Sequence, residues 1–230
     1  MVNLQQRSTQ KELLDSDNIP FADIRQNMKE LNFINTLLGG HSITTDGIKN
    51  FVSNGPLTIC EIGCGGGDNM EAIYKSLKKK GIQVHFTGID LKKECIDFAQ
   101  QQYPSLPATW IVNDYKMTRF ENKPAVIFSS LFCHHFTDDE LVEMMQWMRD
   151  NSATGYFIND LHRNILAYYS IKWLTHLFSR SYLVKNDASV SVARGFKKKD
   201  WKKILDTAGI KNYTIQWKWA FRYLIVVKHG

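Results

Sequence analysis

The sequence has few cysteines and prolines and no long apolar run. Its 230 residues include four cysteines and five prolines. None of the cysteines has the spacing of a metal site, so reduced thiols are expected at Cys60, Cys64, Cys95 and Cys133. No apolar stretch approaches the roughly 18 residues of a membrane span, and residues 1–7 lack the apolar core of a signal peptide. These absences favour a cytoplasmic chain without a transmembrane segment.

The basic charge balance raises the question of nucleic acid. The net charge is +6, and lysines cluster at residues 78–80, 197–199 and 202–203. Each cluster falls near the end of an expected helix, where solvated cations are favourable. Aromatic residues do not alternate with these lysines as they do along a single-stranded nucleic-acid groove. A solvated surface is the better interpretation, and a nucleic-acid partner is not expected.

Glycines follow an apolar run near residue 60. Residues 57–68 read LTICEIGCGGGD, in which β-forming residues lead to an acid and then to Gly63, Gly65 and Gly67. This pattern predicts a buried strand that turns sharply into a helix beginning at Asp68. Glycines allow the backbone to approach a ligand closely, and the first turn of the helix directs unpaired N–H groups at the same place. A cofactor is expected at this turn.

Two nucleotide sites have such a turn. The dinucleotide fingerprint requires a third glycine where this sequence has Asp68, and a carboxylate is unfavourable beside a diphosphate. Glu61, two residues before the first glycine, also suits a cation better than a phosphate. A second strand over residues 82–90 ends in Asp90, which can accept hydrogen bonds from both hydroxyls of a ribose. Asp90 therefore supports a nucleoside, and an NAD-dependent oxidoreductase remains an alternative.

The pattern Glu-x-Gly-x-Gly-x-Gly at residues 61–67 resembles motif I of the class I S-adenosylmethionine (SAM) dependent methyltransferases. In that family the loop holds the methionine portion of SAM, whose ammonium and sulfonium are positive. The resemblance implies SAM as cofactor, with Asn113 or Asp114 accepting a hydrogen bond from the adenine amine. The complete set of expected cofactor-binding residues is Glu61, Gly63, Gly65, Gly67, Asp68, Asn69, Asp90, Leu91, Asn113, Asp114 and Ser130.

Strands and helices alternate along the chain and predict an α/β fold. Seven strands are expected. The first begins at residue 57, and the others cover residues 82–90, 108–114, 125–130, 154–160, 212–218 and 221–228. The last two form an antiparallel hairpin at the edge of a doubly wound, mostly parallel sheet of seven strands. This architecture also matches the class I methyltransferase fold, so the pattern and the resemblance agree over residues 55–228.

Two helical additions to this core are expected. Residues 1–54 form an N-terminal helical cap, with a loose start to about residue 9 and helices over 11–38 and 44–53. Arg25, Asn27 and Asn35 interrupt its apolar stripe and are candidates to face substrate or SAM; a helix surface is the alternative. Residues 55–230 form the SAM-binding domain. Within it, residues 160–196 are an insert after the fifth strand, with a helix over 164–178 and a loop over 179–195 that can close as a lid.

Histidines follow the fourth and fifth strands. Ligands of open α/β sheets bind beyond the carboxyl ends of the strands, where His134, His135 and His162 are expected. The string LFCHHF at residues 131–136 resembles the Leu-x-His-His-Phe of many small-molecule methyltransferases. One neutral histidine can remove the proton of an acceptor hydroxyl, with His135 ranked first, then His134, then His162. A purely structural pair of histidines is the alternative, and no metal site is expected.

The insert supplies the expected acceptor site. Arg163 is a candidate to hold an anionic group, and Tyr168, Tyr169 and Trp173 are candidates for an apolar wall. Their helix is apolar almost all round, so it needs cover from the core, from a partner such as a second copy of the chain in a homodimer, or from substrate. The cap and insert resemble those of bacterial O- or C-methyltransferases of quinone and polyketide pathways.

The expected function is methylation of a small aromatic or polyketide-like acceptor. An RNA methyltransferase is an alternative that fits the basic charge, but the sequence lacks an added RNA-binding module and the Asn/Asp-Pro-Pro-Tyr tetrapeptide of exocyclic amine methylation. A binding protein that keeps SAM without chemistry is a further alternative.

The assignment of Asp90 gives a direct test. We expect Asp90→Ala to weaken SAM binding by at least about 1 kcal/mol, because ribose hydrogen bonds are lost. Isothermal titration calorimetry measures this change. An unchanged affinity would place the nucleoside elsewhere.

Overall fold

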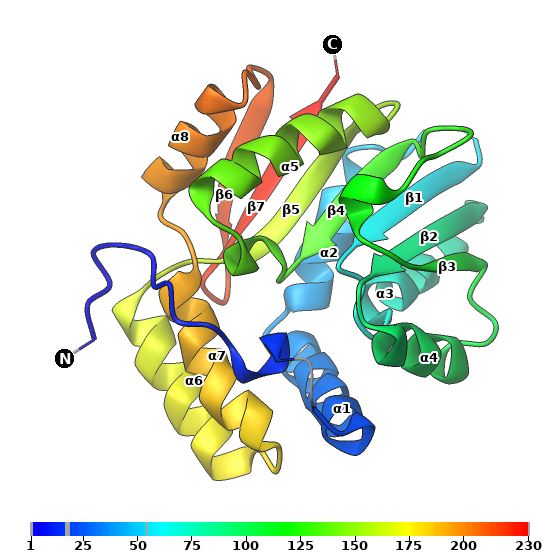
Figure 1. Cartoon of the computed structure of the whole chain (residues 1–230). Helices are drawn as coiled ribbons and strands as arrows, with labels where there is room; N and C mark the ends of the chain where they lie inside the picture. Colours follow the sequence, from blue (N-terminus) through cyan, green and yellow to red (C-terminus); the bar gives the residue numbers. More distant parts are fainter. Residues whose placement is uncertain (1, 17–18, 54, 230) are drawn as a thin grey trace.

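The computed structural model describes residues 2–16, 19–53 and 55–229. Its centre is a seven-stranded sheet with the order β3-β2-β1-β4-β5-β7-β6 (Figure 1). Strands β1 to β5 are parallel, while β7 is antiparallel to both of its neighbours. The doubly wound sheet with an antiparallel edge hairpin is therefore confirmed. The strands are β1 (Leu57–Ile62), β2 (Val84–Asp90), β3 (Ala108–Val112), β4 (Val126–Ser130), β5 (Gly155–Leu161), β6 (Tyr213–Lys218) and β7 (Arg222–Lys228).

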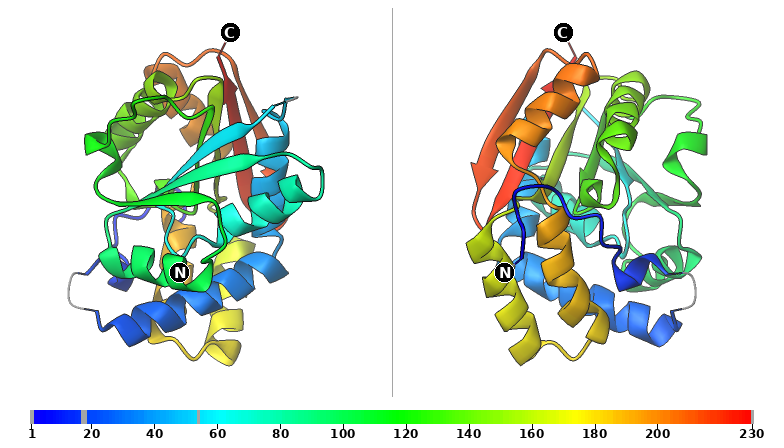
Figure 2. Two further views of the ribbon diagram at one scale, coloured as in Figure 1. Left: turned by 90° about the vertical axis from the view of Figure 1, so that its right-hand side faces the viewer. Right: turned by 60° about the vertical axis from the view of Figure 1, so that its left-hand side comes forward.

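Helices cover both faces of this sheet (Figure 2). Buried side chains of α2 (Gly40–Lys49), α3 (Asp68–Lys78) and α4 (Lys93–Gln102) pack on one face. Those of α5 (Asp138–Asn151) and α8 (Lys198–Thr207) pack on the other. No helix among the described residues is long and apolar enough to cross a membrane.

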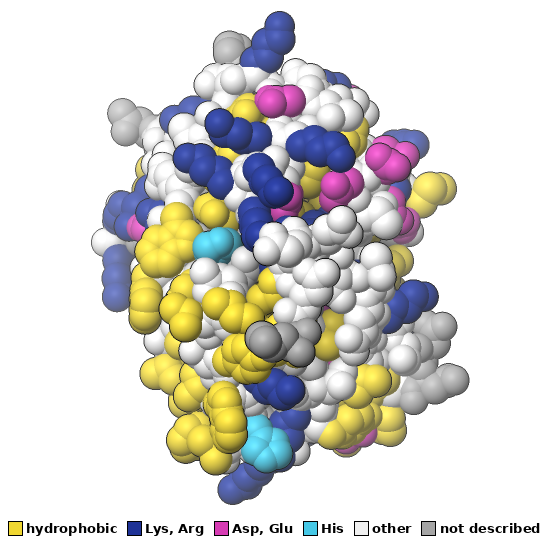
Figure 3. All heavy atoms as spheres, turned by 90° about the vertical axis from the view of Figure 1, so that its left-hand side faces the viewer, with side chains coloured by type: hydrophobic (Ala, Val, Ile, Leu, Met, Phe, Trp, Pro, Cys, Tyr) yellow, Lys and Arg dark blue, Asp and Glu magenta, His cyan; other side chains and the backbone are white. Residues whose placement is uncertain are grey.

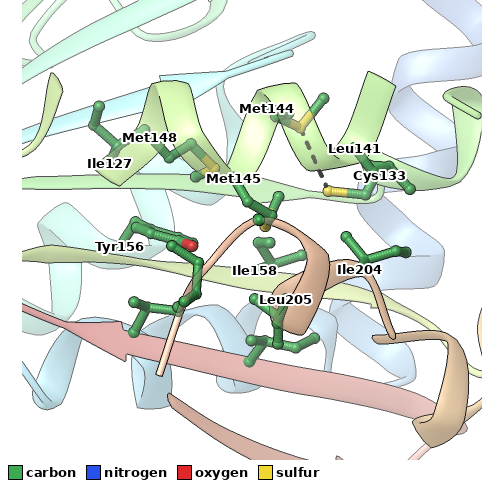
Figure 4. Packing of buried hydrophobic residues seen from close by; sticks show 14 of the residues in the cluster. Ile127, Cys133, Leu141, Met144, Met145, Met148, Tyr156, Ile158, Ile204 and Leu205 are labelled. Carbon is green, nitrogen blue, oxygen red and sulfur yellow. Dashed lines mark hydrogen bonds between the residues drawn. The ribbon is translucent and has the colours of Figure 1, made fainter. Parts of the chain in front are cut away.

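Methionines of α5 fill the second of these cores. Met144, Met145 and Met148 are fully buried between the sheet and Ile204 and Leu205 of α8 (Figure 4). Flexible thioether side chains suit an irregular gap between two helices and a twisted sheet. The central strand β4 is buried along its whole length, as expected for a strand covered on both faces.

Only part of the expected N-terminal cap lies over the carboxyl ends of the strands. Helix α1 (Phe21–Leu37) and the short η1 (Leu13–Asp15) do so, beside α6 (Ile165–Phe178) and α7 (Tyr182–Arg194) (Figure 1). Helix α2 instead packs against β5 within the layer of α3. The packing therefore continues across residue 54, and the proposed boundary there stays a prediction.

The expected loop over residues 179–195 is wrong, because most of it is α7. Ser181 accepts a hydrogen bond from the N–H of Val184 at the start of the helix. Glu30 of α1 accepts further bonds from the N–H groups of Arg180 (3.0 Å) and Ser181 (3.1 Å). These contacts before the helix come from a residue some 150 positions earlier in the chain. Local sequence did not reveal it.

The first residues are also bound rather than loose. Arg7 donates hydrogen bonds to Asp138 (2.8 Å), to the carbonyl of Phe136 (2.7 Å) and to the carbonyl of Arg194 (2.9 Å). Its guanidinium also stacks on the ring of Phe196. These contacts join the N-terminal segment to α5 and α7, and they bring η1 to the edge of the sheet.

The contact between α2 and β5 predicts a stability effect. A Cβ on Gly47 would lie 2.4 Å from the ring of Phe157, which is itself stacked on Phe128. Overpacking costs about 1–3 kcal/mol and here outweighs the roughly 1 kcal/mol that a helix gains from Gly→Ala. We therefore expect Gly47→Ala to lower the free energy of unfolding by about 2 kcal/mol in urea denaturation. Gly55→Ala is the control, because a Cβ there meets nothing within 4 Å. Equal stabilities of the two variants would contradict this packing.

Candidate active site

A cleft of about 430 Å³ lies at the carboxyl ends of β1, β2, β3 and β4. Its walls include the glycine turn between β1 and α3, together with residues of η1 and α1. This is the position at which open α/β sheets bind ligands. Most of the expected cofactor-binding residues line it: Gly63, Gly65, Asp68, Asn69, Asp90, Leu91, Asn113, Asp114 and Ser130.

The three glycines of the turn differ in what surrounds them. Gly63, Gly65 and Gly67 all have positive φ, at 65°, 49° and 77°. A Cβ would also lie 2.2 Å from the ring of Phe132 at Gly63 and 2.6 Å from that of Trp110 at Gly67. At Gly65 a Cβ would meet nothing within 4 Å, so bare backbone faces the open cleft. Gly67 itself does not line the cleft and instead precedes α3, so its contribution is to the shape of the turn.

Glu61 is a buried carboxylate below the turn. Its Oε1 accepts a hydrogen bond from Asn69 (3.1 Å), while Oε2 has no partner among the described residues. Burial, followed by the nearby charges of Asp68 and Asp90, raises the pKa of Glu61 well above its usual value. An unsatisfied carboxylate oxygen amid like charges favours a cationic ligand. The residues present therefore fit the positive amino-acid end of SAM.

Asp90 at the end of β2 accepts two hydrogen bonds from backbone N–H groups. Its Oδ2 accepts from the N–H of Gly65 (2.8 Å) and its Oδ1 from the N–H of Lys92 (2.9 Å). Burial raises the pKa of Asp90. Each carboxylate oxygen can accept a second bond, so a ribose diol can still be held. Leu91 beside it is 69% exposed and offers an apolar surface at the edge of the cleft.

Asn113 and Asp114 lie at the cleft beyond β3. Asn113 Oδ1 accepts from the N–H of Asp114, and Asp114 Oδ1 accepts from the N–H of Lys116, both at 2.9 Å. The second bond caps η2 (Tyr115–Met117). Each side-chain oxygen has a further lone pair, which suits the expected contact with an exocyclic amine.

Asp68 pairs with a residue that sequence reasoning missed. Its Oδ2 lies 2.7 Å from Nε2 of His41, which belongs to α2. Nothing in the local sequence around His41 indicates this contact, because the two residues come from different helices. Asn27 and Asn35 of α1 were candidates, and both line the cleft. Arg25, the third candidate of this helix, is exposed.

A second cavity, of about 370 Å³, adjoins the cleft. Helices α1, α6 and α7 and the residues just before β7 surround it. Its lining is largely hydrocarbon. The two cavities share Leu14, Asn27, Leu31, Asn35, Leu131 and His135.

Two of the three expected catalytic histidines lie at this junction. His135 lines both cavities, and its Nδ1 lies 3.0 Å from Asp15. His134 is buried and lines only the second cavity. Burial alone would lower the pKa of His134, but the carboxylates of Asp160 (2.8 Å) and Glu12 (3.4 Å) raise it to about 9. His134 contacts two carboxylates and does not line the cofactor cleft, so it is less suited than His135 to act as a free base.

His162 and Arg163 do not reach either cavity. His162 accepts a hydrogen bond from the indole N–H of Trp217 (3.2 Å), and burial lowers its pKa. Arg163 is 2% exposed and bonds Asp200 (3.0 Å) and the carbonyl of Leu4 (3.1 Å). The structure thus corrects both assignments: the chain turns away from the cleft after β5, and Arg163 holds the N-terminal segment.

The expected aromatic wall lies on the wrong side of α6. Tyr169 and Trp173 are 39% and 64% exposed, and Tyr168 lies against the N-terminal segment. Hydrophobic side chains gather over this face of the molecule (Figure 3). A helix that is apolar all round gives no indication of which face turns inward. The residues of α6 that do line the second cavity are Ala167, Ser170, Ile171 and Leu174.

The fold and the cleft define an α/β protein of the doubly wound type with a ligand cleft at the carboxyl ends of its strands. Comparison with known proteins identifies the class further. Residues 59–155 match the family model of the methyltransferase domain. No curated protein matches the chain. The family match assigns a methyltransferase domain to residues 59–155, and the seven-stranded sheet around it has the class I methyltransferase fold.

Solved structures share this fold at low identity. Plantazolicin methyltransferase BpumL with bound SAH is 19% identical with a TM-score of 0.68, over 94% of this chain and 91% of that one. Human N-acetylserotonin methyltransferase with SAM is 16% identical with a TM-score of 0.65, over 92% and 57%. Magnesium protoporphyrin IX methyltransferase from Synechocystis PCC 6803 with SAH is 14% identical with a TM-score of 0.52, over 94% and 90%.

The unpaired oxygen of Glu61 generates a test. We expect Glu61→Gln to weaken SAM binding by about 1–3 kcal/mol, because the charged acceptor for the ammonium is lost. The free energy of unfolding should not fall, since the amide removes a buried charge beside Asp68 and Asp90. Calorimetric titration and urea denaturation measure the two effects.

The matched control is Glu121→Gln, which changes an exposed carboxylate. It should leave both quantities within about 0.5 kcal/mol of the parent chain. Wild-type SAM affinity in a folded Glu61→Gln chain would refute the role given to Glu61.

Proposed function

We propose that this chain transfers the methyl group of SAM to a small, mostly apolar acceptor, of aromatic or polyketide-like chemistry, bound in the second cavity. One observation carries the proposal: His135 lines both the cofactor cleft and the second cavity. A methyl donor and its acceptor must meet in line at close range, so two adjoining cavities with a shared wall suit this reaction.

The second cavity fits a small molecule in size and character. Its volume of about 370 Å³ falls within the range of roughly 300–1,000 Å³ for small-molecule sites. Its hydrocarbon lining with a few polar groups is typical of such sites. The named acceptors of similar structures, plantazolicin, N-acetylserotonin and magnesium protoporphyrin IX, support the same class.

An RNA acceptor fits less well. The lysines of α8 belong to the helix layer that α5 and α8 form on one face of the sheet, and none of them lines the second cavity. They therefore do not extend the cavity into a basic groove, which an RNA substrate would need. This arrangement supports a solvated surface at residues 197–203.

Different residues would bind the cofactor, shield the acceptor from water and activate the acceptor. SAM supplies a methyl group on a positively charged sulfur. The carboxyl groups of Glu61 and Asp90 would hold the amino-acid end and the ribose of the cofactor, and α1, α6 and α7 would exclude water from the acceptor. His135, which Asp15 orients through a 3.0 Å contact, activates the acceptor hydroxyl at the junction.

The role of His135 can be separated from cofactor binding. We expect His135→Ala to lower turnover by about 10²–10⁴-fold, the usual contribution of proton handling. SAM affinity should stay within about threefold of the parent value, because the residues assigned to the amino-acid end, the ribose and the adenine are unchanged. Acceptors are found by incubating cell extract with SAM labelled in its methyl group and detecting labelled products by mass spectrometry.

His85→Ala provides the control, because His85 is exposed on β2 and contacts Thr109 rather than either cavity. Turnover by the control should match the parent chain. Parental turnover in folded His135→Ala would contradict the assignment. The absence of any SAM-dependent product from a broad range of extracts would contradict the proposed function.

A further inference from the structure

Three side chains converge between the two cavities from distant parts of the chain. Glu12 precedes η1, and His134 and His135 belong to η3 (Cys133–His135). One ligand atom from each lies within 4.8 Å of the others. We propose that Glu12, His134 and His135 bind a divalent transition-metal ion of the zinc class, a site that the sequence did not predict because its carboxylate lies about 120 residues from its histidines.

The distances suit ligands of one ion better than a direct ion pair. Nε2 of His134 lies 3.4 Å from Oε1 of Glu12, and Nε2 of His135 lies 3.9 Å from Oε2 of Glu12. A charge-assisted N–H···O bond is shorter, at about 2.7–2.9 Å. Two ligands at about 2.0–2.2 Å from a tetrahedral ion are separated by about 3.4 Å. Small side-chain movements would bring all three atoms to this spacing.

The second ring nitrogen of each histidine contacts a carboxylate. Nδ1 of His134 lies 2.8 Å from Asp160, and Nδ1 of His135 lies 3.0 Å from Asp15. Histidines that bind metal ions almost always donate their other N–H in this way, which fixes the tautomer and leaves Nε2 free to coordinate. Both consecutive histidines have a carboxylate at Nδ1 and direct Nε2 toward the same glutamate. A single ion pair between Glu12 and one histidine would not need this second set of contacts.

The surrounding chain holds these ligands in place. Arg194 donates to the carbonyls of His134 (2.9 Å) and His135 (2.6 Å), and Arg7 reaches the carbonyl of His134 (3.3 Å). Ser191 donates to Oε1 of Glu12 (2.7 Å). Preorganised ligands with supporting contacts are what a metal site needs for affinity and for geometry.

The donor set indicates both the metal class and an open coordination position. Two imidazoles and one carboxylate bind zinc in catalytic sites, where the fourth position is left to water or substrate. Imidazole also suits Co²⁺, Ni²⁺ and Fe²⁺ more than Mg²⁺. All three residues line the second cavity, so the fourth position faces the acceptor. With the ion bound, His135 would act as its ligand rather than as a base, and a hydroxyl held at the fourth position would instead have its pKa lowered by the metal; this role, unlike the site itself, rests on the proposed function.

Metal binding to the purified, untagged chain tests the site without any acceptor. After treatment with a chelator and its removal, the chain is titrated with Zn²⁺ by calorimetry and with Co²⁺ by visible absorption; Mg²⁺ serves as the negative probe. We expect one Zn²⁺ per chain and tetrahedral Co²⁺ bands. His135→Ala and Glu12→Gln should each weaken Zn²⁺ binding at least tenfold, while His85→Ala should not.

His135→Ala is the primary variant because His135 is more exposed than His134, with 22% of its side chain accessible, so its loss is less disruptive to folding. Failure of the parent chain to bind Zn²⁺ or Co²⁺, or equal affinity in all variants, would overturn the site and leave a buried ion pair in its place. If Zn²⁺ binds but chelated protein methylates its acceptor at the full rate, the activating role is overturned. If Zn²⁺ binds and no SAM-dependent product forms, the site stands and the proposed function fails.

Discussion

A cluster of three carboxyl groups, of which only Asp68 contacts a basic side chain among the described residues (His41, 2.7 Å), is the constraint on which the site depends. Glu61, Asp68 and Asp90 lie around one turn, and among the described residues none of them forms an ion pair with lysine or arginine. Such an arrangement costs stability unless protons or a cation offset it. The left-handed glycines keep the same turn free of side chains, so Asp68, Asp90 and the bare backbone of Gly65 face one cleft, with Glu61 buried beside it. A cationic nucleoside is the ligand that satisfies both features.

The acceptor side is built from contacts between distant segments. Arg7 and Glu30 fix the N-terminal segment and α1 against α5 and α7, and this brings Glu12 and Asp15 next to the paired histidines. The cofactor cleft belongs to the sheet, whereas the second cavity belongs to the helices added to it. His135 lies in the wall that the two cavities share, between the cofactor cleft of the sheet and the acceptor cavity of the helices.

The positions of the residues that line the cleft could be predicted well from the sequence. Strand, glycine turn and terminal acid are local features, so the order of residues alone places Gly65, Asp90 and Asn113 at one edge of the sheet. Positions fixed by tertiary packing could not be predicted in this way. Glu30 of α1 holds the residues that lead into α7. The inward face of α6 is hidden by its apolar composition, and Glu12 lies far along the chain from His134. His162 and Arg163 follow β5 in the chain, but their side chains pack away from the cleft.

The central claim is that the cleft is shaped for a cationic nucleoside rather than a dinucleotide, and parallel calorimetric titrations of the parent chain with SAM and with NADH test it most directly. The account predicts saturable binding of SAM at one site per chain and no binding of NADH at the same concentrations. Binding of NADH without binding of SAM or SAH would contradict it.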